Sequence, residues 1–314
     1  MLRNLRILFL ISLLGLLTAG LTNCGQKEEA KEVKLKNNKE IPKKEKVSSK
    51  ENPIRVALGA MLTPKEGFIY YKQLLDYIEE KSGRPIKFVD KTNYTEINAL
   101  LKSRNIDLAF VCSGPYVKGH DEFGLELLVA PQAYGAKVYY SYIIAHIDSP
   151  VKKFDDLRGK IFCFTDPVSN SGALVPKYML AKMNETPDSF FKKFTYTYTH
   201  DKSIQAVAQK ICDGAAVDSL IWEYTNKTNP KFTSKTKIVL KSPPYGIPPV
   251  VIHPGIDPEL KKKLREILLG MHKDKRGKEI LKGMMVDKFV LPDDSDYNSI
   301  REMENWTVKQ SSKK

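Results

Sequence analysis

The chain has 314 residues, 42% of them hydrophobic and 28% charged, with a formal net charge of +14. This length exceeds one compact core and suits two lobes of roughly 100–150 residues each. The lysines are spread over helix faces and an N-terminal linker rather than gathered on one arm, which argues against a nucleic-acid-binding protein. The composition therefore excludes a disordered chain and favours a globular body with a solvated basic surface.

The N-terminus has the pattern of an export signal. Two arginines precede an apolar run over residues 7–17, which is shorter than the roughly 20 residues that a membrane-spanning helix needs. Residues 21–24 (Leu-Thr-Asn-Cys) resemble a bacterial lipobox, although Asn23 stands where Gly or Ala is usual. An ordinary secretory signal is the alternative. We expect residues 1–23 to be a signal peptide and Cys24 to be lipidated, which would anchor the protein to a bacterial membrane, facing the periplasm or the cell surface.

Residues 24–52 are rich in Lys, Glu, Asn and Ser and contain no aromatic residue, so they are predicted to form a flexible tether. From residue 53 strands and helices alternate. Short apolar runs predict strands at 54–58, 86–89 and 108–111, with helices near 68–78 and 97–101 between them and a turn at 113–115. This order predicts a parallel sheet covered by helices, whose ligands bind beyond the carboxyl ends of the strands.

A second α/β unit is predicted after a long strand and a break at Ser149-Pro150. The expected elements are strands at 139–145, 160–164, 215–220, 237–240 and 250–253, and helices at 172–183, at 204–211 and over the C-terminal remainder. Two crossings, near 147–150 and 240–247, suggest a clamp. Lobe 1 is predicted to contain residues 53–147 and 245–314, and lobe 2 residues 148–244.

The cysteine pattern predicts no metal site. If Cys24 is lipidated, Cys112, Cys163 and Cys212 remain, and none belongs to a CxxC pair. Cys163 stands in the apolar run 161–164 and is expected to be a small buried hydrophobe rather than part of a disulfide framework. An oxidising compartment would still permit one disulfide. The histidines lack metal-ligand spacing, and no cofactor motif is present.

The segment 165–172 joins a predicted strand to a predicted helix. Ser169, Asn170 and Ser171 are all good helix N-caps, and capping is the simpler interpretation. Three small polar residues in succession exceed what one cap requires, and the peptide dipoles at a helix N-terminus favour an anion. Gly172 is expected to allow a ligand to approach closely. The segment therefore predicts an oxyanion site.

Residues 164–176 (FTDPVSNSGALVP) are similar to the phosphate-, phosphite- and phosphonate-binding proteins of ABC importers. The resemblance continues in the same order at 106–110, 114–116, 200–201, 215–219 and 293–301, and it spans residues 53–302. It implies a type II periplasmic-binding-protein fold of the α/β class, with two Rossmann-like lobes joined by a two-strand hinge. It also implies a small phosphorus oxyanion as ligand, a permease and an ATPase as partners, and a monomer.

The resemblance assigns ligand-binding roles to particular residues. Ser169, Asn170 and Ser171 would donate hydrogen bonds to the ligand oxygens, with His200 donating from the same lobe. The other residues implied by the family pattern are Tyr94, Tyr134 and Ser113 from the opposite lobe, and Asp218 near the amine of an aminoalkyl ligand. The alternatives are a surface aromatic for Tyr94, a capping or core histidine for His200, and a lysine partner for Asp218.

Two positions depart from the family pattern. Asn170 replaces a threonine, which keeps a short polar side chain. Pro248 stands where the family often has an acidic residue that contacts the ligand amine. Without that carboxylate a buried ammonium would be poorly paired, at a cost of a few kcal/mol. We therefore expect phosphite, methylphosphonate or phosphate to be preferred over 2-aminoethylphosphonate.

The sequence does not support an enzyme. It has no Gly-x-Ser-x-Gly elbow, HExxH motif or Walker loop. Ser169, Asp166 and His200 could be arranged as a hydrolase triad, but serine and histidine serve equally well as neutral donors to an oxyanion. The competing function is a sensory or surface-interaction lipoprotein of the same fold with a different solute.

Overall fold

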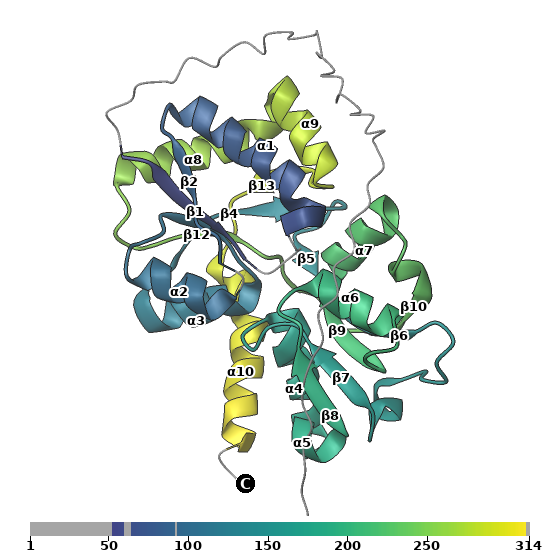
Figure 1. Ribbon diagram of the computed structural model, residues 1–314. Coiled ribbons are helices and arrows are strands. Elements are labelled where there is room, and N and C mark those ends of the chain that lie inside the picture. Colours follow the sequence, from purple (N-terminus) through teal and green to yellow (C-terminus); the bar gives the residue numbers. More distant parts are fainter. Residues whose placement is uncertain (1–51, 60–63, 92, 312–314) are drawn as a thin grey trace, which may run out of the picture. The chain divides into compact units, whose positions relative to one another are not determined.

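The computed structural model describes residues 52–59, 64–91 and 93–311 (Figure 1). All of them belong to one compact unit, Val47–Lys314. The predicted signal peptide, the predicted lipidation site Cys24 and nearly all of the predicted tether lie outside the described residues. Within the described part of the chain, no helix combines the length and the apolar character needed to cross a bilayer.

The first lobe is built on a six-stranded sheet. Its strands, in spatial order, are β13 (Lys288–Val290), β4 (Glu126–Gln132), β12 (Val250–Ile252), β3 (Leu108–Phe110), β1 (Ile54–Leu58) and β2 (Ile86–Phe88). β1 pairs in parallel with β2 and β3, whereas β12, β4 and β13 add antiparallel ladders. The predicted strands at 54–58, 86–89 and 108–111 are confirmed, but β4 and β13 were not predicted.

Helices cover both faces of this sheet because its strands alternate their side chains. Val56 and Leu108 pack with α1, α8 and α9 on one face, and Ala57 and Ala109 pack with α2 and α3 on the other. The helices are α1 (Pro64–Ser82), α2 (Tyr94–Lys102), α3 (Ser113–Phe123), α8 (Pro258–Gly270) and α9 (Lys275–Gly283). The predicted turn at 113–115 is wrong, since these residues form the first turn of α3.

The second lobe contains a five-stranded sheet. Its strands, in spatial order, are β10 (Thr236–Lys241), β6 (Ser141–His146), β9 (Gly214–Asp218), β7 (Ile161–Phe164) and β8 (Lys193–Tyr196). The predicted strand at 139–145 is divided, and its larger part, β6, pairs with β9 and β10. Residues 141–146 therefore belong to the second sheet rather than to lobe 1 as predicted.

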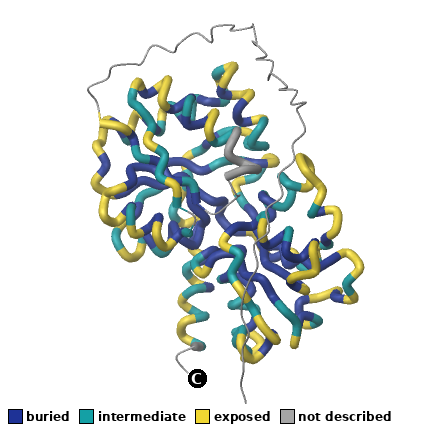
Figure 2. Tube along the Cα trace, viewed as in Figure 1, coloured by how far each residue is buried: buried dark blue, intermediate teal, exposed yellow. Residues whose placement is uncertain are grey.

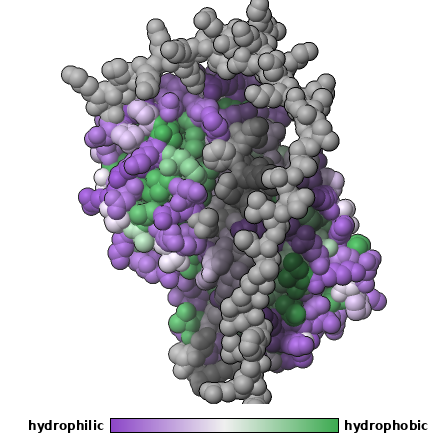
Figure 3. Space-filling model, in the orientation of Figure 1, coloured by the Kyte–Doolittle hydropathy of each residue, from purple (hydrophilic) through white to green (hydrophobic). Residues whose placement is uncertain are grey.

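The helices of the second lobe are the π-helical turn η2 (Asn170–Leu174), α4 (Val175–Lys182), α5 (Pro187–Phe190), α6 (His200–Ala208) and α7 (Ser219–Thr228). Of these, η2, α6 and α7 each follow one of the parallel strands β7, β8 and β9. Short 3₁₀ turns complete the chain: η1 (Phe154–Leu157), η3 (Thr233–Lys235), η4 (Met271–Lys273) and η5 (Asp294–Tyr297). Figure 2 shows the buried strands at the centre of each lobe and exposed residues along the outer helices. Hydrophilic side chains dominate the part of the described surface visible in Figure 3, as the net charge leads one to expect.

Two short strands connect the lobes. β5 (Val138–Tyr139) and β11 (Tyr245–Gly246) form an antiparallel pair, through which the chain enters and leaves the second sheet. The last helix, α10 (Asn298–Ser311), packs against α3 of the first lobe and α4 of the second. Its Trp306 ring lies 5.1 Å from the Tyr178 ring of α4.

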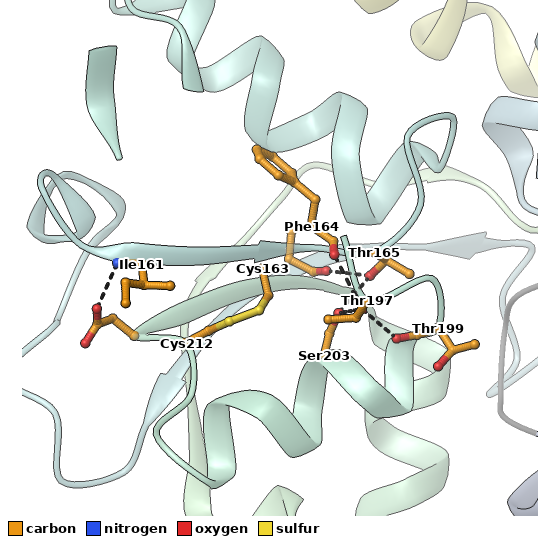
Figure 4. The surroundings of a disulfide bond; sticks show 10 residues. Ile161, Cys163, Phe164, Thr165, Thr197, Thr199, Ser203 and Cys212 are labelled. Atoms are coloured by element: carbon orange, nitrogen blue, oxygen red, sulfur yellow. Dashed lines mark hydrogen bonds between the residues drawn. A yellow bond between two sulfur atoms is a disulfide. The ribbon is translucent and has the colours of Figure 1, made fainter. Parts of the chain in front are cut away.

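Cys163 and Cys212 form a disulfide, with Cα atoms 6.0 Å apart (Figure 4). The expectation that Cys163 is an unpaired small hydrophobe is therefore wrong. The parallel pairing of β7 with β9 sets Phe162 opposite Gly214, which places the two cysteines together although 49 residues separate them. Cys112 is a free, buried thiol.

Candidate ligand-binding site

Several helices begin at neighbouring strand ends between the two lobes. They are α2 and α3 of the first lobe, and η2, α6 and α7 of the second. The backbone N–H of Tyr94, at the start of α2, lies 3.3 Å from Asp166 Oδ2 across the lobes. A Cβ on Gly114, in the first turn of α3, would lie 2.5 Å from the carbonyl oxygen of Val168. Free N–H groups and dipoles at such helix starts create a positive environment.

The segment 169–172 forms the start of one of these helices. Ser169 Oγ accepts a hydrogen bond from the Gly172 N–H at 3.1 Å, so Ser169 is an N-cap. Asn170 Nδ2 donates to the Tyr139 hydroxyl at 3.0 Å. Ser171 Oγ is buried and has no partner. Gly172 packs closely against Thr165, because a Cβ at position 172 would lie 2.5 Å from Thr165 Cβ.

His200 is the first residue of α6 and is fully buried. Its Nδ1 accepts the Asp218 backbone N–H at 3.0 Å, which assigns the proton of the neutral ring to Nε2. Burial lowers the pKa of His200 to about 3, so the ring is neutral near pH 7. The Nε2–H group has no partner. His200 thus supplies a neutral donor, with its second nitrogen bound to the protein.

Asp218 ends β9 and caps α7. Its Oδ1 accepts the backbone N–H groups of Leu220 and Ile221 at 2.7 and 3.4 Å, while its buried Oδ2 has no partner. Burial raises the pKa of Asp218 to about 7. No lysine forms an ion pair with this carboxylate among the described residues, so the alternative of a lysine partner is wrong. Asp218 therefore has one oxygen available for a ligand.

The first lobe and the hinge each contribute one buried tyrosine, Tyr94 and Tyr139. The Tyr94 hydroxyl has no partner, so Tyr94 is not a surface aromatic. The Tyr139 hydroxyl accepts from Asn170 and lies 3.4 Å from Cys112 Sγ. Burial is the main reason that the pKa values of both tyrosines are raised, and the nearby Asp218 charge adds to the effect. Asp218 therefore lies within electrostatic reach of both rings.

The two remaining predicted residues have other partners. Ser113 is buried, but its hydroxyl donates to the Gly246 carbonyl in the hinge at 2.6 Å. Tyr134 is 53% exposed, and its hydroxyl lies 3.2 Å from Met285 Sδ. The structure therefore does not bring Tyr134 together with the buried polar residues.

The site is defined by buried polar atoms that lack hydrogen-bond partners. Besides Asn98 Oδ1 on α2 and His272 Nδ1 in η4, six such atoms are found among the described residues, and we name these six the unpaired cluster: Tyr94 OH, Asn170 Oδ1, Ser171 Oγ, Thr199 Oγ1, His200 Nε2 and Asp218 Oδ2. Native proteins pair nearly all buried polar atoms, so such a grouping indicates a place for a ligand. Sequence reasoning missed Thr199, although a threonine before a predicted helix is an N-cap signal. It also missed Tyr139, for which the sequence holds no local signal.

Two α/β lobes, a two-strand hinge and a buried polar cluster where the lobes meet define a two-lobed solute-binding protein. Residues 60–297 match the family model described as "ABC transporter, phosphonate, periplasmic substrate-binding protein", and the chain belongs to this family.

Individual relatives agree with this assignment. The phosphonates-binding periplasmic protein of Escherichia coli (strain K12) is 25% identical over 234 residues, which cover 73% of this chain and 69% of that protein. A binding protein component of an ABC phosphonate transporter from Pseudomonas aeruginosa superposes with a TM-score of 0.78 at 25% identity, covering 83% of this chain and 88% of that one. PhnD1 from Prochlorococcus marinus (MIT 9301), solved with methylphosphonate, gives a TM-score of 0.72 at 20% identity, covering 81% and 98%. The predicted type II periplasmic-binding-protein fold is confirmed.

Proposed function

We propose that this protein captures a small phosphorus oxyanion (phosphonate, phosphite or phosphate) between its lobes and delivers it to the permease and ATPase of an ABC importer. The observation that carries the proposal is the unpaired cluster at the helix starts. Tyr94, Ser171, Thr199 and His200 each present a buried donor without a partner. Hydrogen bonds to a charged ligand contribute about 1.5–3 kcal/mol each, and helix N-termini add favourable dipoles.

Asp218 suits an anion that carries a proton. A fully ionised oxyanion beside a carboxylate would be repelled, whereas a P–OH group can donate to the free Oδ2 of Asp218. With its pKa raised to about 7 by burial, Asp218 can alternatively hold the proton itself and donate to the ligand. In either case one proton is shared between Asp218 and the oxyanion.

Ligand binding would favour the closed arrangement of the lobes. Tyr94 belongs to the first lobe, and the other donors belong to the second. A ligand that pairs with both lobes stabilises the closed state over any open state by the difference in contacts. Every role in this proposal is one of binding, so no reaction is assigned to Ser169, Asp166 or His200.

We also propose that the protein is an exported, lipid-anchored monomer, with the signal peptide 1–23, acylated Cys24 and the tether 24–52. The support is the basic start, the apolar run and the cysteine in the sequence. Two or three acyl chains on one cysteine are enough for stable anchoring.

A ligand panel tests the proposed function. We expect phosphate, phosphite or methylphosphonate to raise the melting temperature of the full chain, because ligand at 100 times its Kd adds about 2.7 kcal/mol. Ser171→Ala should weaken binding about 10- to 100-fold, since one hydrogen bond to a charged group is lost. Ser234→Ala, at an exposed position, is the matched control. The absence of a shift with every phosphorus oxyanion would refute the proposal and favour the sensory or surface-interaction alternative.

A further inference from the structure

An apolar pocket of about 90 Å³ lies beside the first turn of α7. Residues from both lobes and the hinge segment line it. The ones that matter here are Tyr71 of α1, Phe110 and Val111 at the end of β3, Leu220 and Ile221 of α7, and Pro248. The volume exceeds the 10–15 Å³ needed for one water several-fold, so it has room for a short organic group.

The pocket adjoins the unpaired cluster through Asp218. The Oδ1 atom of Asp218 holds the N–H groups of Leu220 and Ile221, whose side chains form one wall. On the other wall, Val111 directly precedes Cys112, whose Sγ lies 3.8 Å from Ser169 Oγ. Burial raises the pKa of Tyr71 to about 12, and the Asp218 charge contributes to that rise. Asp218 therefore borders the pocket wall through Oδ1 and contributes its free Oδ2 to the unpaired cluster.

The lining determines which organic groups are compatible with the pocket. None of the described residues that form its walls carries a charged side chain. With Asp218 Oδ2 engaged by the phosphonate head, as proposed above, an ammonium placed there would lose its hydration without gaining a counter-ion among the wall residues, which is unfavourable. An alkyl group would leave water for a carbon-lined space, which is favourable in proportion to the area buried.

We infer that the site selects alkylphosphonates, with the phosphonate head at the unpaired cluster and an uncharged chain of a few carbons in the apolar pocket. This inference rests on the proposed function and narrows it from phosphorus oxyanions in general to one substrate class. It also gives Pro248 a role. The proline ring lines the apolar pocket with carbon atoms at the position where a carboxylate would bind a ligand amine.

Calorimetric titration of the full chain with methyl-, ethyl-, propyl- and butylphosphonate tests the inference. We expect Kd to fall about three- to fourfold with each added methylene until the pocket is filled, from about 0.8 kcal/mol per buried methylene. Propylphosphonate and 2-aminoethylphosphonate form a matched pair that differs at the terminal group. We expect the propyl compound to bind at least tenfold more tightly.

Two variants locate the effect in the pocket. Leu220→Phe should fill it and reduce the ratio of butyl to methyl affinity at least fivefold, while Leu291→Phe, at a position 57% exposed, should leave that ratio unchanged. Pro248→Asp should reverse the preference between the propyl and aminoethyl compounds. Circular dichroism shows whether Pro248→Asp folds. If it does not, the butyl-to-methyl affinity ratio of Leu220→Phe and the wild-type alkylphosphonate series still test the inference.

The two proposals fail in different ways. If methylphosphonate binds but affinity is flat or falls with chain length, or if the aminoethyl compound binds as tightly as the propyl compound, the inference is overturned and the proposed function stands. If no phosphorus compound binds, the proposed function itself is refuted.

Discussion

Two groups of polar side chains differ in whether their hydrogen bonds are complete: one lies within the second lobe, and the other lies mostly there but includes Tyr94 of the first lobe. The first group, the hydroxyl network, consists of Thr165, Thr197 and Ser203 (Figure 4). Thr165 Oγ1 donates to the Ala216 carbonyl at 3.1 Å and contacts Ser203 Oγ at 3.2 Å, and Ser203 Oγ lies 2.6 Å from Thr197 Oγ1. Each of these hydroxyls has protein partners.

The second group is the unpaired cluster, whose Thr199 is two residues after Thr197 and whose His200 is three residues before Ser203 on α6. Ser171, Thr199 and His200 are as deeply buried as the hydroxyl network, or nearly so, yet each retains an atom without a partner. Burial alone therefore does not distinguish a structural polar group from a binding group. Completion of hydrogen bonds does, because an unsatisfied buried group costs about 1–3 kcal/mol unless a ligand pairs with it.

Removing the disulfide beside the hydroxyl network should have the largest effect on stability. Cys163 and Cys212 close a loop across a sequence separation of 49 residues, for which the chain-entropy model gives about 4 kcal/mol. We expect the double variant Cys163→Ala/Cys212→Ala to lose about that much free energy of unfolding in denaturant titration. Unchanged stability would show that this part of the lobe does not depend on the crosslink.

Asp218→Asn should reveal how much folding stability the protein loses when the buried carboxyl of Asp218 ionises. The pKa of Asp218 is raised from 3.8 to about 7 in the folded protein, so the wild type loses stability as pH rises between these values. Asparagine cannot ionise and can still cap α7. Without ligand, we expect the free energy of unfolding of the wild type to fall relative to that of the variant by roughly 2–3 kcal/mol from pH 5 to pH 8.

The measurement is thermal or chemical unfolding in phosphate-free buffer across that pH range. Asp213→Asn, at an exposed position, is a suitable control. A pH-independent difference would mean that Asp218 does not titrate as a buried, unpaired carboxyl.

A pair of hydroxyl deletions tests the comparison directly. Thr165→Val should lower the free energy of unfolding by about 1–3 kcal/mol with or without ligand, because the carbonyl of Ala216 and the hydroxyl of Ser203 lose a partner. Ser171→Ala should leave the ligand-free stability unchanged or raise it by up to about 1–3 kcal/mol, because it removes a buried hydroxyl that has no partner. Equal losses in the two variants would remove the distinction between the groups.

The smallest expected effect concerns His200, whose ring should not change its charge near neutral pH. Burial lowers the pKa of His200 to about 3, so its ring should remain neutral from pH 5 to pH 8 with the proton on Nε2. Nitrogen-detected NMR of the imidazole can check both the charge and the tautomer. A His200 signal that titrates near pH 6.5 would contradict the burial on which the site depends.

Local sequence patterns predicted the parts of the site that depend on local structure. Ser169 caps a helix after a strand, as its neighbours indicate, and His200 begins α6 at a strand–helix junction. The start of α3 was predicted as a turn because Ser-Gly-Pro is common in turns, yet proline is also favoured in the first turn of a helix.

Features that depend on pairing across the fold were not predictable in this way. Tyr139 meets Asn170 because the hinge places β5 beside the second lobe, and Cys163 meets Cys212 because β7 and β9 are neighbours. The exposed position of Tyr134, apart from the unpaired cluster, likewise depends on the arrangement of the whole fold and not on local sequence. β13 has only three residues, too few for a pattern that alternates along a strand to be recognised.

Because the C-terminal helix α10 contacts both lobes, a change in its packing would report movement of the lobes. Because α10 packs on α3 and α4 together, any rotation of one lobe away from the other must change the packing of α10 on one of these helices, and Trp306 contacts Tyr178 on the α4 side. Indole emission is sensitive to such changes in polarity and contact. Trp222 lies in α7, so a Trp222→Phe background would leave Trp306 as the sole indole of the chain, and ligand-driven closure could be followed without attaching a label.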